Sequence, residues 1–170
     1  MELYIISKRN LNDAIDNVYF LKLNRADSQL EIYKKANEKC LRESYPIRED
    51  FDASNYELFT LYKTMSCIFG GEGKRRTPQG IFNVEKVTSE EYISPYYPAS
   101  GQVKFFGYLV VFEDYFIHSD LYSMDANQSN FREKKSISLA DKDTSGCIRV
   151  SQSDLEWLVE NIPVGTVVEF

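Results

Sequence analysis

Alternating apolar and polar positions run through most of the chain and predict a domain built mainly of strands. Residues 18–24 (VYFLKLN) and 29–35 (QLEIYKK) flank the turn-prone RADS, which is the pattern of a β-hairpin. Residues 55–69 alternate over many positions, and residues 80–87 follow with β-branched and aromatic side chains at a spacing of two. We expect each of these segments to be a strand.

A second hairpin is predicted where two apolar runs flank Glu113 and Asp114, within residues 107–119. It would place His118, the one histidine of the chain, at the end of its second strand. The polar residues 119–143 that follow show no clear period and are long for a connection in a compact domain. We expect them to form a lid-like insertion.

Helical periodicity is clearest near the end of the chain. Residues 153–156 (SDLE) match a capping box, Pro163 and Gly165 would end the helix, and residues 166–170 (TVVEF) would form a last strand. The apolar face of this helix is formed by Leu155, Leu158, Val159 and Ile162. Together the pattern predicts a mainly β fold, a sandwich or partly open barrel with one or two short helices, as a single domain over residues 1–170.

Length and charge narrow the function classes. The 170 residues carry a net charge of −6 and 14% aromatic residues, so one domain with a real core is expected, and nucleic acid is not an expected partner. The basic residues 74–76 are a local exception; the run 72–76 is either a solvated loop or a contact for anionic glycan or lipid phosphates. No stretch approaches 18 uncharged apolar residues, so no membrane insertion is expected. We expect a monomer.

The cysteines give the first hint of chemistry. Cys40, Cys67 and Cys147 cannot all pair, and their spacing with His118 fits no zinc pattern, so we expect a free thiol, no metal and no cofactor. Cys147 follows a glycine that would let backbone N–H groups approach a developing oxyanion. It is therefore either a small buried hydrophobe or a nucleophile activated by the histidine.

Four motifs, in order, resemble the L,D-transpeptidase catalytic domain of the YkuD type. They are TPQGIFNV at residues 77–84, FIHS at 116–119, TSGCIRV at 144–150 and DLEWLVENIPVGTVVEF at 154–170. The resemblance implies an enzyme in which a cysteine attacks the third residue of a peptidoglycan stem tetrapeptide, expels the terminal D-residue and forms a thioester. An amine of a second stem then completes a 3-3 crosslink. The alternative is an L,D-carboxypeptidase, in which water resolves the thioester, or a related stem-peptide amidase of the same fold.

The same resemblance assigns roles to residues of this chain. Cys147 is implied as the nucleophile, His118 as its base, and the main-chain carbonyl of Ser119 as the group that fixes the imidazole. Backbone N–H groups of Ser145, Gly146 and Cys147 are implied as the oxyanion hole. Carbapenems would then be expected to acylate the thiol.

The sequence departs from the family pattern in two places. The family has a histidine at the position of Ser145. Its absence in this chain favours hydrolysis or a specialised substrate. In addition, 28 residues separate His118 from Cys147, more than is common in the family. The residues of this enlarged segment that would line the donor cleft are Tyr122, Phe131 and Arg132.

Arg149 follows the cysteine as the family's arginine does. It would hold a carboxylate of the stem peptide, brace the site, or be an exposed strand cation. Cys67 is expected to be buried packing, and Cys40 has no assigned role. The tyrosines at positions 92, 96, 97 and 108 would stack on sugar or peptide, or serve packing.

The expected partners are peptidoglycan stem peptides, and the expected location is the periplasm, the cell envelope or the exterior of the cell. The chain begins without the pattern of a signal peptide, which leaves a trimmed chain or another export route, such as that of a secreted antibacterial effector. A peptidoglycan-binding module without catalysis is the alternative of another class. The presence of both the cysteine and the histidine disfavours that alternative.

Overall fold

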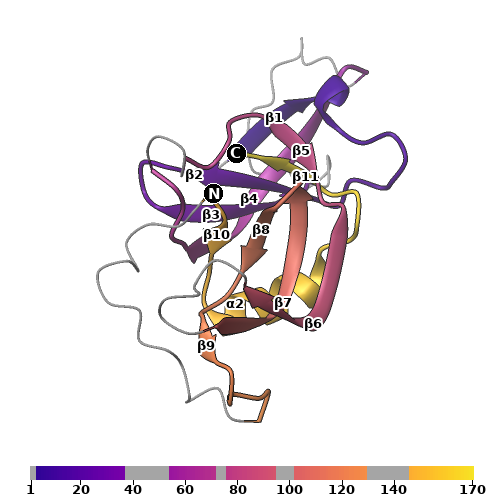
Figure 1. Cartoon of the computed structure of the whole chain (residues 1–170). Coiled ribbons are helices and arrows are strands. Elements are labelled where there is room, and N and C mark those ends of the chain that lie inside the picture. Colours follow the sequence, from indigo (N-terminus) through magenta and orange to yellow (C-terminus); the bar gives the residue numbers. More distant parts are fainter. Residues whose placement is uncertain (1–2, 37–53, 72–75, 95–101, 130–145) are drawn as a thin grey trace.

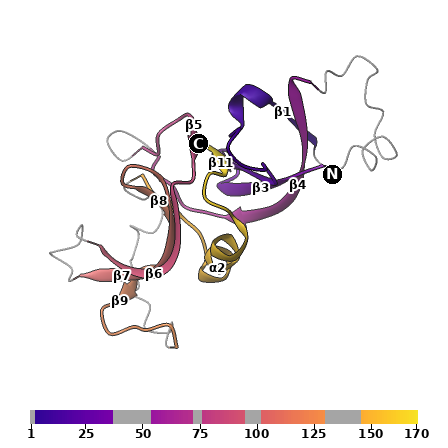
Figure 2. The ribbon, with the colours of Figure 1, turned by 90° about the vertical axis from the view of Figure 1, so that its right-hand side faces the viewer.

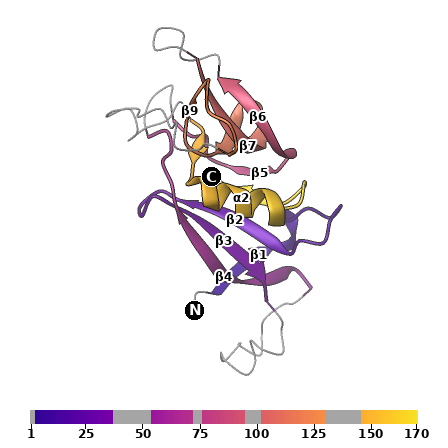
Figure 3. The same cartoon turned by 90° about the horizontal axis from the view of Figure 1, so that it is seen from below.

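In the described residues, two β-sheets lie on either side of one α-helix (Figure 1). The structure is a computed structural model that describes residues 3–36, 54–71, 76–94, 102–129 and 146–170. Figures 2 and 3 show the helix α2 (Gln152–Asn161) lying between the strands of the two sheets. Among the described residues, no helix is long and apolar enough to cross a membrane.

Sheet A has six strands in the order β1-β4-β3-β2-β11-β5. The strands β11 and β2 run parallel, and the other neighbours are antiparallel. Their bounds are β1 Leu3–Ser7, β2 Tyr19–Asn24, β3 Gln29–Lys35, β4 Tyr56–Ser66, β5 Ile81–Asn83 and β11 Val167–Glu169; a short 3-10 helix, η1 (Lys8–Asn10), follows β1.

Sheet B has five strands in the order β10-β8-β7-β6, with β9 pairing separately with β7. The pair β10 and β8 is parallel, and the other pairs are antiparallel. Their bounds are β6 Lys86–Ser94, β7 Val103–Phe112, β8 Tyr115–His118, β9 Tyr122–Ser123 and β10 Ile148–Arg149.

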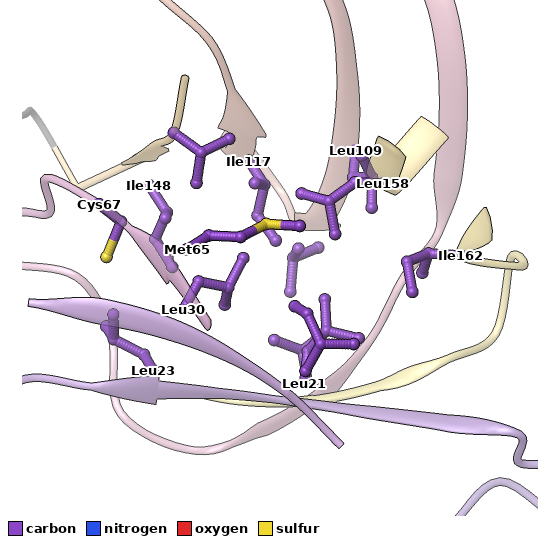
Figure 4. Packing of buried hydrophobic residues seen from close by; sticks show 14 of the residues in the cluster. Leu21, Leu23, Leu30, Met65, Cys67, Leu109, Ile117, Ile148, Leu158 and Ile162 are labelled. Carbon is purple, nitrogen blue, oxygen red and sulfur yellow. The ribbon is translucent and has the colours of Figure 1, made fainter. Parts of the chain in front are cut away.

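The largest hydrophobic cluster fills the space between the sheets (Figure 4). Sheet A contributes residues such as Leu21 and Met65, sheet B contributes Leu109 and Ile117, and the helix contributes Leu158. Burying side chains of this kind stabilises the fold by about 1.5 to 3 kcal/mol each. One consequence is that sheet B keeps one face against this core and turns the other face away from it.

Both predicted hairpins and the last strand are confirmed, and the fold is mainly β, as expected, with one short α-helix among the described residues. The capping prediction is wrong by two residues. The helix is capped by Ser151, whose Oγ accepts a hydrogen bond from the Asp154 N–H at 3.2 Å, and not by Ser153. Both serines satisfy the same sequence rule, and the earlier one has the extended backbone that an N-cap needs.

Candidate active site

His118 is the last residue of β8, and its ring is held by the next residue of the chain. Its Nδ1 lies 2.7 Å from the main-chain oxygen of Ser119, and the side chain of His118 is buried. A carbonyl oxygen can only accept a hydrogen bond, so Nδ1 carries the ring proton. The lone pair of Nε2 is therefore available to accept a proton from another group.

An aromatic cluster on sheet B surrounds the imidazole. The ring of Phe105 stacks on His118 with centroids 4.2 Å apart, and Phe105 in turn stacks on Tyr92. Burial and, to a smaller extent, the charge of Arg149 lower the pKa of His118 to about 3, although the bond to Ser119 acts in the opposite direction. The histidine is therefore neutral at pH 7, as a general base must be.

Cys147 lies immediately before β10 and is placed by the pairing of that strand with β8. In this parallel pair Ile148 lies opposite Ile117, and Arg149 lies opposite His118. Both isoleucines belong to the core between the sheets. Because side chains alternate along a strand, the cysteine and Arg149 share the other face of sheet B with His118. The structure thus brings Cys147 and His118 to one face from positions 29 residues apart in sequence.

The thiol of Cys147 is only partly buried and has polar contacts. Its Sγ accepts a hydrogen bond from the Phe116 N–H at 3.4 Å and lies 3.5 Å from the carbonyl oxygen of Asp114. Burial raises the pKa of Cys147, while the Phe116 N–H and the charge of Arg149 lower it. The net shift is upward, so at neutral pH the site holds a thiol and a neutral imidazole, and a base is needed to remove the thiol proton.

Arg149 is buried, so the expectation of an exposed strand cation is wrong. Its backbone exchanges two hydrogen bonds with Ile68, at 2.8 and 2.9 Å, which fixes β10 against the end of β4. Its charge lowers the pKa values of both His118 and Cys147. An arginine at this position therefore acts on both candidate catalytic groups.

Gly146 has a backbone conformation that other residues rarely adopt. Its φ is +115°, and an added Cβ would lie 2.4 Å from the ring carbon Cε1 of Tyr115. The glycine therefore allows the chain to pass close to the Tyr115 ring just before the cysteine. Ser145, the other predicted oxyanion-hole residue beside it, lies outside the described residues.

A polar network behind His118 was not predicted from the sequence. The Ser119 hydroxyl donates to Oε1 of Gln152 at 2.5 Å, and the Tyr122 hydroxyl donates to the same oxygen at 3.3 Å. The Gln152 amide donates to the Phe106 carbonyl oxygen at 3.3 Å. This glutamine therefore holds the residue whose carbonyl holds the histidine. Its position after Ser151 at the helix start was the only available signal.

The structure describes only some of the residues predicted to bind substrate. Tyr122 is described: it is 2% exposed, and burial, followed by the charges of Asp120 and Glu156, raises its pKa to about 12. The predicted insertion 119–143 begins with the short strand β9, which pairs with β7. Arg132 and the rest of this insertion from residue 130 onward lie outside the described residues, as do Phe131 and Cys40.

Comparison with known proteins identifies the family to which this fold belongs. The family model of the YkuD L,D-transpeptidase catalytic domain matches residues 51–170. No curated protein matches the sequence significantly.

Solved structures share the fold at low sequence identity. L,D-transpeptidase 1 of Mycobacterium tuberculosis is 11% identical with a TM-score of 0.54, and the match covers 89% of this chain and 60% of that protein. Bd1075 of Bdellovibrio bacteriovorus is 13% identical with a TM-score of 0.55, and the match covers 99% of this chain and 53% of that protein. L,D-transpeptidase 3 of M. tuberculosis, solved with a faropenem-derived adduct, is 13% identical with a TM-score of 0.51. The match covers 89% of this chain and 59% of that protein.

The chain therefore spans less than two thirds of the length of these structures. The family model, in contrast, matches well over half of the chain itself and includes every residue of the thiol site. The chain belongs to the YkuD family of L,D-transpeptidase catalytic domains.

Proposed function

We propose that this domain transfers the acyl group of a peptidoglycan stem tetrapeptide through a thioester on Cys147. The observation that carries the proposal is the placement of the Cys147 thiol and the neutral imidazole of His118 on one face of sheet B. The family acts on peptidoglycan, which supports this substrate class and a location in the cell envelope.

In the first half-reaction the Cys147 sulfur attacks the carbonyl carbon of the third stem residue. His118 takes the thiol proton on Nε2 as the carbon–sulfur bond forms, and the charge that develops on the carbonyl oxygen is held by the N–H groups of Gly146 and Cys147. The carbon–nitrogen bond to the terminal D-residue then breaks. The imidazolium returns its proton to the departing amine, so the products are a thioester and a free D-amino acid.

The thioester is resolved by either of two nucleophiles. An amine of a second stem would form a new amide and a 3-3 crosslink, whereas water would form a carboxylate and leave a tripeptide. In both cases the carbon–sulfur bond breaks, His118 accepts a proton from the nucleophile, and that proton returns to the sulfur. Ser145 leaves more room than the histidine of relatives and offers a hydroxyl that would orient water, so we expect hydrolysis to exceed crosslinking.

Two further residues of the site support the first step without reacting. Ser119, held by Gln152, keeps the imidazole in the tautomer that leaves Nε2 free. Arg149 lowers the pKa of Cys147, and its guanidinium is suited to hold a stem-peptide carboxylate.

Product analysis on a defined substrate tests the proposal. The protein is incubated with purified disaccharide-tetrapeptide, and the products are identified by mass spectrometry, with Cys147→Ala as the control. Loss of one D-alanine supports the carboxypeptidase reaction, and a linked dimer supports the transpeptidase reaction. An unchanged substrate, with protein that is folded by circular dichroism, would favour a binding module instead.

A further inference from the structure

Thr77, the first residue of the TPQG motif, is buried directly behind the thiol loop. It is 0% exposed, although its hydroxyl is polar. Its Oγ1 donates a hydrogen bond to the Gly146 carbonyl oxygen at 2.8 Å and accepts one from the Gly70 N–H at 2.9 Å. A carbonyl can only accept and an N–H can only donate, so both roles of the hydroxyl are determined by its neighbours.

Thr77 is itself held on both sides of its backbone. Its N–H donates to the Gly70 carbonyl oxygen at 2.9 Å. Its carbonyl oxygen accepts from Nη2 of Arg25 at 2.9 Å, and the same nitrogen lies 3.1 Å from the Pro78 oxygen. The hydroxyl therefore sits on a fixed support, and the carbonyl that it bonds has little freedom to turn.

The bond to the Gly146 oxygen determines the direction of a second group. The Gly146 carbonyl and the Cys147 N–H belong to one planar peptide unit, in which the C=O and N–H bonds point in opposite directions. Because the oxygen is bonded to the buried Thr77, the Cys147 N–H points away from Thr77. The Tyr115 ring lies against the Cα of Gly146, in the space that a Cβ would need.

We propose that Thr77 is the positioning residue of the oxyanion hole, a role that rests on the proposed function. It touches neither the substrate nor the sulfur. By anchoring the Gly146 oxygen, it aims the Cys147 N–H at the site where negative charge develops on the attacked carbonyl. A single oxyanion-hole donor contributes about 10²- to 10³-fold to the rate of acyl transfer, so an aiming residue is expected to contribute a part of that factor.

Two reactions at the same sulfur separate this role from a general structural one. Acylation by faropenem passes through a tetrahedral oxyanion, whereas alkylation by iodoacetamide forms a carbon–sulfur bond with loss of iodide and no oxyanion. Both adducts are followed on the Cys147 peptide by mass spectrometry. The ratio of the two rates reports the oxyanion hole, because displacement of the thiol or a change in its pKa alters both reactions.

Thr77→Val keeps the shape of the side chain and removes the hydroxyl, and Thr77→Ser keeps the hydroxyl. We expect Thr77→Val to slow acylation by about 10- to 100-fold and to leave alkylation within about twofold. Thr77→Ser should keep both rates within about threefold of wild type. Equal rates of acylation in wild type and Thr77→Val, or equal losses in both reactions, would overturn the role of Thr77.

A second variant keeps the test decisive if Thr77→Val does not fold. Arg25→Met removes the bond to the Thr77 carbonyl and should lower the acylation rate by about threefold to tenfold with alkylation unchanged. An unchanged ratio of rates in this variant would contradict the proposal. Wild-type protein that is alkylated but never acylated would instead contradict the proposed function itself.

Discussion

The two described cysteines lie within two residues of the β-bridge between Ile68 and Arg149, and their environments are very different. Cys67 is 7% exposed and belongs to the main core, and burial alone raises its pKa to about 12 (Figure 4). Burial also raises the pKa of Cys147, but the Phe116 N–H and the charge of Arg149 oppose that shift. The comparison teaches that a nearby hydrogen-bond donor, a cation and a base distinguish a cysteine that is a candidate nucleophile from one that only packs in the core.

Exchanging each cysteine for alanine should separate the two environments most strongly. Cys147→Ala should abolish D-alanine release from tetrapeptide, a loss above about 10⁴-fold, because the acyl-enzyme cannot form. Cys67→Ala should keep the rate and lower the free energy of unfolding by roughly 1 to 2 kcal/mol, because it leaves a small cavity in the core. Rates and denaturant unfolding of both variants check the pair; residual turnover by Cys147→Ala would break the comparison.

Removing the base should give the next largest effect. His118→Gln is expected to slow acylation of Cys147 by about 10² to 10⁴, the usual contribution of a positioned base. The thiol has a raised pKa, so it does not ionise by itself at neutral pH. The measurement is the rate of faropenem acylation at pH 7, and a near-normal rate would mean that another group activates the sulfur.

The buried histidine should also make stability depend on pH. Its pKa is about 3 in the folded state and about 6.5 in the unfolded chain, so the unfolded chain binds a proton below pH 6.5 that the folded chain does not. Stability should therefore fall as the pH falls from 6.5 toward 3. Between pH 7 and pH 5, wild type should lose about 2 kcal/mol more than His118→Gln. Urea unfolding at both pH values checks this, and parallel losses would show that His118 is not buried in its neutral form.

The network behind the histidine should give the smallest effect. Gln152→Ala removes the acceptor of the Ser119 hydroxyl and should slow acylation by about tenfold, the equivalent of one lost hydrogen bond. The matched control is Asn161→Ala at the other end of the same helix, whose amide bonds the Trp157 carbonyl oxygen at 2.8 Å.

Iodoacetamide alkylation of Cys147 in Gln152→Ala should fall less than acylation, because it depends less on an oriented base. Equal acylation rates in Gln152→Ala and Asn161→Ala would show that the glutamine does not position the imidazole.

Much of the fold could be predicted because its signals are local. The hairpins 18–35 and 107–119 follow from alternation around short turns, and the helix face follows from the spacing of Leu155 and Leu158. The strand β1 was not predicted, because its pairing with β4 depends on residues about 50 positions away.

Sequence motifs could point to single residues of the candidate site, but they could not predict contacts that depend on the tertiary fold. The motifs pointed to Cys147 and His118 as candidates, but the burial of Arg149 follows from the distant bridge to Ile68. Gln152 was missed because its importance lies in reaching Ser119, 33 residues earlier in the chain. Contacts of this kind have no periodicity that a sequence can display.

The most direct test of the account is to locate the covalent adduct that faropenem forms. The intact protein is treated with the compound, its mass is measured, and the adduct is assigned to a peptide by digestion. We predict one equivalent on Cys147, with no adduct in Cys147→Ala. Labelling of Cys67 or Cys40 in place of Cys147, or no adduct on folded protein, would contradict the claim that Cys147 is the acylated nucleophile.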